Sequence, residues 1–504
     1  MDLPQEGAPR RRLAARLLHR AAAPGHQRGA RVRRRRLPLR GRAVRQQGER
    51  RPLVRRHHHG GLERAHDRGA GVVGHDHDHA RRRGRVLVAR PRGGARPSPI
   101  PRGGRAQHRR RPGGGAGQPS TPVRRFRFTR QRSARVTVPF FSLADQTRQL
   151  RSELLAAMTE VLDTQGFANG PPVAKLEAEL ASYLGVKHVV ALNTGTTALQ
   201  AALLGLGVSP GDDVVTVAHT WISTCWAISY VGARPVFADV DEGTNGMDPR
   251  ALAKAITPKT KAILPVHLHG HPVDLDAILD IAKTKGVPVI EDAAQSIGST
   301  YKGRQTGGLG AVNATSFYPS KNLGAAGEGG AIMTNDGAIA DRVRSLRDHA
   351  QQGRHHHVEL GFNWRMDGLQ GAVLRVKLPH LDRWNERRRA IAARYLDGLK
   401  GAKGLRLFPE QSWARCNWHV FPVFHAQREA LRAALEKKGV ATGVHYPTPV
   451  HLQPAYAHLG VAKGALPVAE RLAATEVSLP MFAELSDAQV DEVIGAVRAA
   501  CAEL

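Results

Sequence analysis

The first 135 residues contain no tyrosine, tryptophan, asparagine, cysteine or lysine, and Ile100 is their only isoleucine. They hold 38 arginines against seven acidic residues, a net charge of +31 out of +32 for the whole chain, so the remainder carries only +1. Proline, glycine and arginine interrupt every apolar periodicity, and the segment cannot bury enough surface to offset the entropy of ordering it. We therefore predict that residues 1–135 are a disordered, Arg-rich leader.

This basic leader has three interpretations. It could be a tail that binds nucleic acid or another polyanion, or a transit peptide, although transit peptides are rich in serine and amphipathic. We favour a third: arginine without lysine is what a GC-rich gene yields when it is translated upstream of its true start or in the wrong frame. The histidines at 57–59 and at 75, 77 and 79 then reflect the same bias and not a metal site.

Cysteine is also scarce. Cys225, Cys416 and Cys501 lie far apart and form no CxxC pair, which argues against a disulfide framework and a zinc site. No apolar run reaches the ~20 residues of a membrane helix, and no signal peptide is visible. These features predict a cytoplasmic enzyme without a structural metal.

From Val136 onward the composition is ordinary, and short apolar runs alternate with helical periodicity. This alternation predicts an α/β fold with a mostly parallel sheet covered by helices on both faces, whose ligands bind beyond the carboxyl ends of the strands. We expect a large domain over residues 136–385 and a smaller domain of mixed α and β structure over 386–504. The strands are predicted at 188–192, 213–217, 234–240, 262–267, 288–291, 314–318 and 330–334, and the helices at 150–162, 173–184, 198–206, 222–230, 249–256, 275–285 and 367–395.

Three segments carry candidate chemistry. Residues 193–198, Asn-Thr-Gly-Thr-Thr-Ala, open a helix with N–H groups and hydroxyls that suit a phosphate, although threonine there could simply cap the helix. Asp292 follows a buried strand, where it could cap the next helix or meet a ligand. Lys321 stands between an apolar strand and the glycine-rich run 324–330, and alone it would pass for a surface lysine. In this order the three are the anchors of a pyridoxal phosphate site: phosphate cradle, partner of the pyridine nitrogen, and imine-forming amine.

About 370 residues, from Val136 to the C-terminus, resemble the DegT/DnrJ/EryC1/StrS family of sugar aminotransferases, which implies the type I aminotransferase fold. The leader matches nothing in that family. The matching segments are Val-Pro-Phe-Phe at 138–141, Gly-Phe-Ala-Asn-Gly at 166–170, Gly-Thr-Thr-Ala-Leu at 195–199, Pro-Val-Phe-Ala-Asp-Val at 235–240, Glu-Asp-Ala-Ala-Gln at 291–295, Ser-Phe-Tyr-Pro-Ser-Lys-Asn-Leu-Gly at 316–324, Gly-Phe-Asn-Trp-Arg-Met-Asp at 361–367 and His-Tyr-Pro at 445–447.

The resemblance assigns roles to individual residues. Lys321 would bind the cofactor covalently and then move a proton as general base, which requires that burial and nearby positive charge lower its pKa. Asp292 would pair with the pyridinium nitrogen, and Gln295 would contact the ring hydroxyl. Trp221 would stack on the ring, unless it is a core tryptophan at a helix start. The phosphate would be bound by Thr196, Thr197, Ser316 and, from the neighbouring subunit of a homodimer, Asn363.

The substrate side is less determined. His445 and Tyr446 fall where family members line the sugar pocket, but such a turn is also ordinary loop material, and the histidines at 355–357 could lie at the active-site mouth. Some relatives carry histidine in place of Lys321 and remove a hydroxyl from the sugar instead of adding an amine. Because residue 321 is lysine here, the resemblance implies transamination.

The expected reaction moves an amino group from L-glutamate to carbon 3 or 4 of a nucleotide-linked keto-sugar, in amino-sugar or polysaccharide biosynthesis. One alternative acceptor is a non-nucleotide ketone such as a cyclitol or an aminobenzoate precursor. A protein that regulates or binds nucleic acid through its basic leader is an alternative of a different class.

Overall fold

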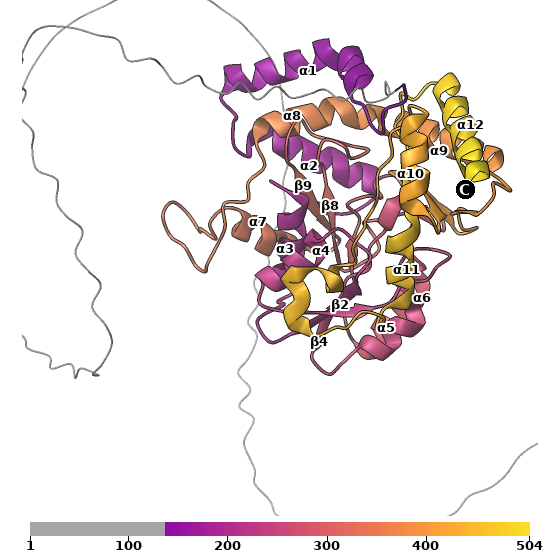
Figure 1. Ribbon diagram of the computed structural model, residues 1–504. Helices are drawn as coiled ribbons and strands as arrows, with labels where there is room; N and C mark the ends of the chain where they lie inside the picture. Colours follow the sequence, from indigo (N-terminus) through magenta and orange to yellow (C-terminus); the bar gives the residue numbers. More distant parts are fainter. Residues whose placement is uncertain (1–136) are drawn as a thin grey trace, which may run out of the picture. The chain divides into compact units, whose positions relative to one another are not determined.

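The computed structural model describes residues 137–504 (Figure 1), so the predictions about the leader and its histidines lie outside the described residues. None of the helices within this range is long and apolar enough to cross a membrane. The strands are β1 (His188–Leu192), β2 (Asp213–Val217), β3 (Arg234–Ala238), β4 (Thr260–Ile263), β5 (Ile290–Asp292), β6 (Thr300–Tyr301), β7 (Arg304–Gln305), β8 (Val312–Ser316), β9 (Gly330–Thr334), β10 (Leu405–Leu407), β11 (Ala414–Arg415), β12 (Phe421–His425) and β13 (Glu476–Leu479).

The α-helices are α1 (Ala144–Thr164), α2 (Gly170–Leu184), α3 (Gly195–Gly205), α4 (Ser223–Tyr230), α5 (Pro249–Ala255), α6 (Leu275–Lys285), α7 (Gly337–Arg347), α8 (Gly368–Lys377), α9 (Leu381–Gly398), α10 (Arg428–Lys437), α11 (Pro467–Thr475) and α12 (Asp487–Glu503). Short 3₁₀ helices are η1 (Leu268–Gly270), η2 (Leu378–His380), η3 (Val450–Leu452) and η4 (Pro454–Leu459).

The main sheet joins two groups of strands. The parallel group β3-β2-β4 meets the group β5-β8-β9-β1 through parallel bridges from Ile263 to Val289 and from Val266 to Asp292. Only β9 runs against its neighbours, since it pairs antiparallel with both β1 and β8. The prediction of a mostly parallel sheet is therefore confirmed, with one reversed strand.

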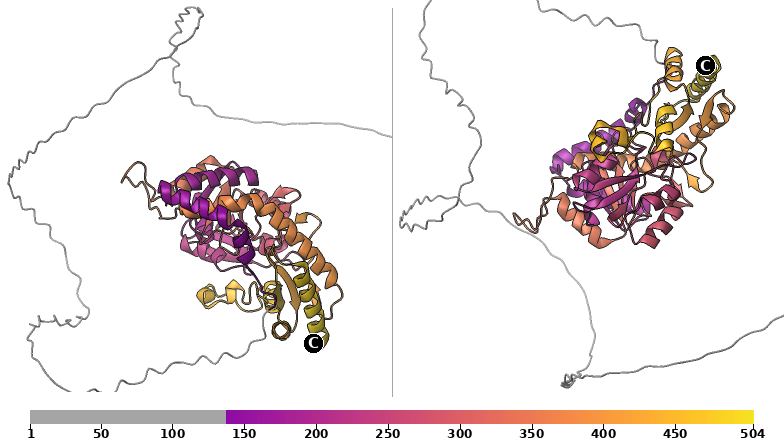
Figure 2. Two further views of the ribbon diagram at one scale, coloured as in Figure 1. Left: turned by 90° about the horizontal axis from the view of Figure 1, so that it is seen from above. Right: turned by 60° about the horizontal axis from the view of Figure 1, so that its bottom comes forward.

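Helices cover both faces of this sheet (Figure 2). Along β1, Val190 and Leu192 belong to one hydrophobic core, while Val189 and Ala191 belong to a second, as the twofold alternation of a strand requires. The first core also includes α3 and the second includes α2. A strand buried on both sides reads as a continuous apolar run, which is why 188–192 was predictable.

The C-terminal part builds a second, antiparallel sheet of β10, β12 and β13, with α9 and α12 side by side at one end of the molecule (Figure 2). The proposed boundary at residue 385 falls inside α9, which is continuous across it. Residues 450–475 return to the main sheet, where the Val450 N–H donates to the Ala218 carbonyl at 2.8 Å. The division into two domains stays a prediction.

Several predicted bounds differ from the structure by a few residues, and proline explains two of the differences. The single helix expected over 367–395 is divided into α8, η2 and α9, because Pro379 has no N–H to donate and disturbs the regular helix. The strand expected over 262–267 ends at Ile263, because Pro265 cannot donate to a ladder. Beyond it only Val266 still bridges to β5.

Candidate active site

A cavity of about 400 Å³ opens where β1, β2, β5 and β8 end, at the carboxyl edge of the main sheet. Open α/β sheets bind their ligands at this edge. Eight of the predicted site residues line the cavity: Thr196, Trp221, Asp292, Gln295, Ser316, Lys321, His445 and Tyr446. The sequence-distant segments that carry them are therefore brought together by the fold.

The start of α3 lies against the end of β8. A Cβ at Gly195 would come within 2.6 Å of the Ser316 Cβ, and one at Gly330 would come within 2.3 Å of the Thr194 carbonyl oxygen. Glycine is therefore needed at both positions. Thr196 donates its hydroxyl hydrogen to the Ser223 Oγ at 2.9 Å, so two hydroxyls meet beside the helix N-terminus. Unpaired N–H groups, hydroxyls and the helix dipole together suit a phosphate group.

Two of the predicted phosphate contacts lie away from this cavity. Thr197 forms a capping box with Thr194, and its hydroxyl donates to Asn193 Oδ1 at 2.8 Å. In this conformation Thr197 therefore completes the capping box at the start of α3, where an N-cap such as Thr194 contributes about 1 kcal/mol. Asn363 is exposed and pairs through its backbone with Asp348. The histidines at 355–357 are exposed and do not line the cavity.

Asp292 is the buried carboxylate at the end of β5, only 4 % exposed. Its Oδ2 accepts a hydrogen bond from the Thr224 hydroxyl at 2.9 Å, and its Oδ1 accepts one from the Ala294 N–H at 3.1 Å. Burial raises the pKa of Asp292, whereas these two hydrogen bonds and the charge of Lys321 act in the opposite direction. Such a group suits a cationic partner inside the cavity.

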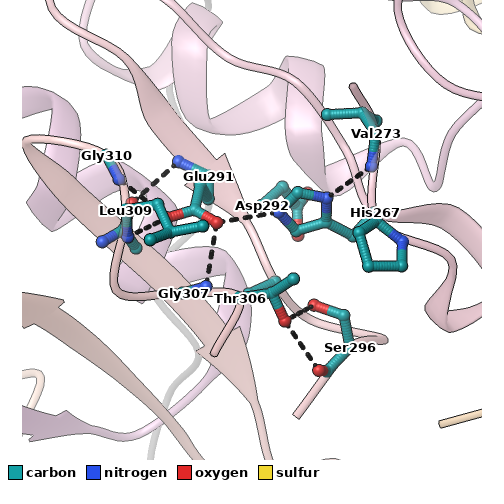
Figure 3. A network of polar contacts seen from close by, with 12 residues as sticks. His267, Val273, Glu291, Asp292, Ser296, Thr306, Gly307, Leu309 and Gly310 are labelled. Atoms are coloured by element: carbon teal, nitrogen blue, oxygen red, sulfur yellow. Dashed lines mark hydrogen bonds and ion pairs between the residues drawn. The ribbon is translucent and has the colours of Figure 1, made fainter. Parts of the chain in front are cut away.

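The neighbouring Glu291 lies on the same strand and joins β5 to His267 and to the loop at residues 307–310 (Figure 3). Its carboxylate is fully buried and accepts hydrogen bonds from three loop N–H groups and from His267 Nε2 at 2.9 Å. Since His267 Nδ1 accepts the Val273 N–H, its ring proton resides on Nε2. Despite burial, these donors hold the pKa of Glu291 below its usual value. The three loop donors are Gly307, Leu309 and Gly310.

Lys321 lies on the turn after β8, where its N–H donates to the Tyr318 carbonyl. Burial lowers the pKa of Lys321 to about 8, while the Asp292 carboxylate acts to raise it. The expected depression by burial is confirmed, but the expected nearby positive charge is wrong, because the neighbouring charge is negative. At neutral pH an amine with this pKa is unprotonated roughly a tenth of the time, far more than an exposed lysine.

Another part of the cavity wall is formed by aromatic and polar side chains. The Gln295 side-chain amide donates to the Tyr446 hydroxyl at 3.1 Å and accepts the His269 N–H at 2.6 Å, so its orientation is fixed. The Trp221 ring lies 5.3 Å from that of Tyr446 and is 55 % exposed. The alternative of a core tryptophan at Trp221 is therefore wrong.

Sequence reasoning missed several lining residues. The hydroxyl residues between positions 220 and 224 could have been predicted as site residues, because they closely follow the predicted parallel strand at 213–217. No local signal marked His419, which arrives from the C-terminal part of the chain, or Glu328 in the glycine-rich run. The missed residues are Thr220, Ser223, Thr224, Tyr318, Ser320, Glu328 and His419.

The residues at the cavity fit pyridoxal phosphate. The hydroxyls of Thr196, Ser223 and Ser316 line the cavity at the start of α3, where a phosphate would bind. The carboxylate of Asp292 is buried, and the amine of Lys321 has a lowered pKa. Within residues 137–504, no cluster of three or more histidine, cysteine or acidic side chains is arranged to hold a metal ion. Fold and site together define a pyridoxal-phosphate-dependent aminotransferase of fold type I.

Comparison with known proteins gives the family. Residues 148–498 match the model of the DegT/DnrJ/EryC1/StrS aminotransferase family, and the chain belongs to this family. It is 45% identical over 361 residues to dTDP-3-amino-3,4,6-trideoxy-α-D-glucose transaminase of Streptomyces venezuelae, covering 72% of this chain and 95% of that one.

Two further comparisons cover the same part of the chain. UDP-2-acetamido-2-deoxy-3-oxo-D-glucuronate aminotransferase of Pseudomonas aeruginosa is 40% identical over 363 residues, with 71% and 99% of the two chains covered. The crystal structure of DesV from S. venezuelae has a TM-score of 0.71 and 45% identity, with 72% and 98% covered. Related structures include forms with pyridoxal phosphate and with its amine, the cofactor of this family.

Proposed function

We propose that the protein transfers an amino group from L-glutamate to carbon 3 or 4 of a nucleotide-linked keto-sugar. The observation that carries this proposal is that Lys321 and Asp292 face one cavity beside the start of α3. The relatives named above act on dTDP- and UDP-linked sugars, which supports a nucleotide sugar as the acceptor. Buried, unpaired cysteines suit the reducing cytoplasm, where we place the reaction.

Each residue has a task in this proposal. Thr196 and Ser316 bind the phosphate at the N-terminus of α3. Asp292 keeps the ring nitrogen protonated, and bound pyridoxal phosphate thereby supplies an electron sink for the substrate carbanion. The Lys321 amine attaches the cofactor and then moves the proton between the reacting carbons.

The remaining predicted residues shape the rest of the pocket in this proposal. Gln295 contacts the ring hydroxyl, and Trp221 covers the ring face. His445 and Tyr446 receive the sugar. Thr197 stays a predicted phosphate contact, which its capping hydrogen bonds do not favour.

Two half-reactions test the proposal. Glutamate should bleach the long-wavelength absorbance of the holoenzyme, and a nucleotide-linked keto-sugar should restore it. We expect restoration by dTDP- or UDP-linked 3-keto or 4-keto sugars and none by cyclitol ketones. If only a cyclitol ketone restored the absorbance, the acceptor would be that ketone and not a nucleotide sugar. If glutamate did not bleach the absorbance, glutamate would not be the amino donor.

We further propose that the protein is a homodimer whose active sites are shared between subunits. Large apolar side chains are exposed on the surface, among them Leu162 at 57 %, Phe167 at 50 % and Leu360 at 92 %. Where such side chains gather into a contiguous patch, they mark an interaction surface. Asn363, close in sequence to Leu360, would then reach the phosphate in the partner's site.

Mixing two impaired variants tests the shared site. Asn363→Ala should weaken cofactor binding, and Lys321→Ala should abolish turnover. In a mixed dimer one site regains both Lys321 and a partner's Asn363, so activity should exceed that of either variant alone. Refolding the two variants together, with each refolded separately as control, gives the measurement. A mixture no more active than the separately refolded Asn363→Ala protein would contradict the shared site.

A further inference from the structure

A hydrogen-bonded chain runs from the cavity into the C-terminal sheet. His445 lines the cavity together with Lys321, and its Nδ1 lies 2.7 Å from the Ser478 Oγ. Ser478 in turn donates its hydroxyl hydrogen to Glu476 Oε1, and the Glu476 Oε2 accepts the His445 backbone N–H at 2.7 Å. Glu476 and Ser478 are both fully buried.

The alternation of β13 explains this placement. Val477 and Leu479 belong to the hydrophobic core, so Glu476 and Ser478 face the opposite side of the strand. Two backbone hydrogen bonds between Gly443 and Ser478, of 3.0 and 2.9 Å, hold the segment before His445 against β13. The three side chains are thus held in one fixed arrangement by strand geometry.

The direction of the hydrogen bonds determines which ring nitrogen of His445 carries the hydrogen. Ser478 has one hydroxyl hydrogen, which it donates to the Glu476 carboxylate, so Nδ1 of His445 must carry a hydrogen and donate it to Ser478 Oγ. The neutral ring then has a lone pair on Nε2. No hydrogen bond occupies Nε2 within residues 137–504, and the ring lines the cavity.

We propose that His445, Ser478 and Glu476 form a proton relay that takes up a proton from the bound sugar substrate and stores it on Glu476. A hydroxyl or ammonium group of the substrate gives its proton to Nε2. The proton on Nδ1 passes to Ser478 Oγ, and the Ser478 hydroxyl proton passes to Glu476 Oε1. After these three transfers His445 is neutral, Ser478 again carries a hydroxyl hydrogen, and Glu476 is protonated. The proton returns to the substrate by the reverse path. This relay rests on the proposed function, since it needs a sugar in the cavity.

The charges around this hydrogen-bonded chain suit a carboxylate that takes up a proton near neutral pH. Burial raises the pKa of Glu476 to about 7, against the hydrogen bonds from Ser478 and from the His445 N–H. Burial, with the charge of Lys321 and then His219, lowers the pKa of His445 to about 4, so the ring itself does not hold the extra proton. Arg428 and Arg432 on α10 face Glu476 and favour its ionised form, while Tyr446 beside it stays neutral because its own pKa is raised.

Two measurements on the holoenzyme test the relay. The first is the pH dependence of kcat/KM when the probe is dTDP-3-amino-3,4,6-trideoxy-α-D-glucose, whose transamination is followed by the cofactor's absorbance. In the wild type the rate should rise with pH through about 7, as Glu476 ionises. Glu476→Gln and Ser478→Ala should flatten this rise, lower kcat more than KM changes, and leave the half-reaction with glutamate at its usual rate. Ser478→Thr, which retains a hydroxyl, should restore the rise.

The second measurement needs no sugar. Infrared difference spectra between about pH 6 and pH 8, on either side of the shifted carboxyl titration, should show a protonated carboxyl band that is absent in Glu476→Gln. The matched control is Glu470→Gln, which removes a carboxylate that pairs with His451 at 3.1 Å, outside the cavity. This control should keep both the band and the pH profile.

The outcomes separate the relay from the reaction itself. If the wild type bleaches with glutamate but reacts with no nucleotide amino-sugar, the proposed acceptor fails, and the infrared band still decides whether Glu476 stores a proton. If Glu476→Gln and Ser478→Ala keep the wild-type profile, the relay is wrong. Loss of the cofactor's absorbance in both variants would show a structural role and would also overturn it.

Discussion

Replacing Lys321 by alanine is expected to abolish turnover and to remove the long-wavelength absorbance of the bound cofactor. The amine is the group that attaches the cofactor and moves the proton, and loss of a general base alone lowers a rate by about 10²–10⁴-fold. Loss of the covalent attachment adds to this. Steady-state kinetics and an absorbance spectrum on the same preparation measure both effects.

The matched control for this variant is Lys302→Ala. Lys302 is about half exposed and pairs with Asp276 at 2.7 Å, well outside the cavity. Its removal should leave the rate and spectrum unchanged, since exposed ion pairs contribute little. A Lys321→Ala protein that turned over at an undiminished rate would overturn the assignment of Lys321.

Asp292→Asn should lower kcat by about 10²–10³-fold, the usual cost of removing one preorganised electrostatic contact from an active site. Asparagine has the shape of aspartate and retains one of the two oxygens that accept from Thr224 and Ala294, so the charge is lost with little change of volume. The Asp292 charge raises the pKa of Lys321, and the variant should therefore titrate Lys321 at a lower pH than the wild type. Modification of Lys321 by an amine-specific reagent across pH, on cofactor-free protein, measures this shift.

The control for the charge is Asp276→Asn, an exposed carboxylate in the surface pair with Lys302. It should change neither kcat nor the titration of Lys321. An Asp292→Asn protein with wild-type kcat would contradict the role of a partner for the ring nitrogen. An unshifted titration of Lys321 would show that the two side chains are not electrostatically coupled.

The sequence predicted the main sheet well, because its strands are buried on both faces and read as short continuous apolar runs. β1, β2 and β9 have the predicted bounds. Helix α6 was equally clear, since Gly286 ends it in the left-handed conformation that glycine adopts easily. The local effects of Pro265 and Pro379 were underestimated, because an apolar pattern alone does not show where hydrogen-bond donors are missing.

The site was predictable where a motif carries its chemistry in a few consecutive residues, as around Lys321 and Asp292. It was not predictable where the partner comes from a distant segment. Thr224 reaches Asp292 from the first turn of α4, and Glu476 and Ser478 reach His445 through strand pairing. The position of Thr197 three residues after Thr194 fits a helix cap as well as a phosphate contact, and in the structure it caps.

The most direct test of the central claim is to locate the covalent attachment of the cofactor. Reducing the holoenzyme with borohydride makes that linkage permanent, and digestion followed by mass spectrometry identifies the peptide that carries it. The account predicts a single modified peptide, with the cofactor on Lys321. Attachment at another lysine, or no attachment to protein that still transaminates, would contradict it.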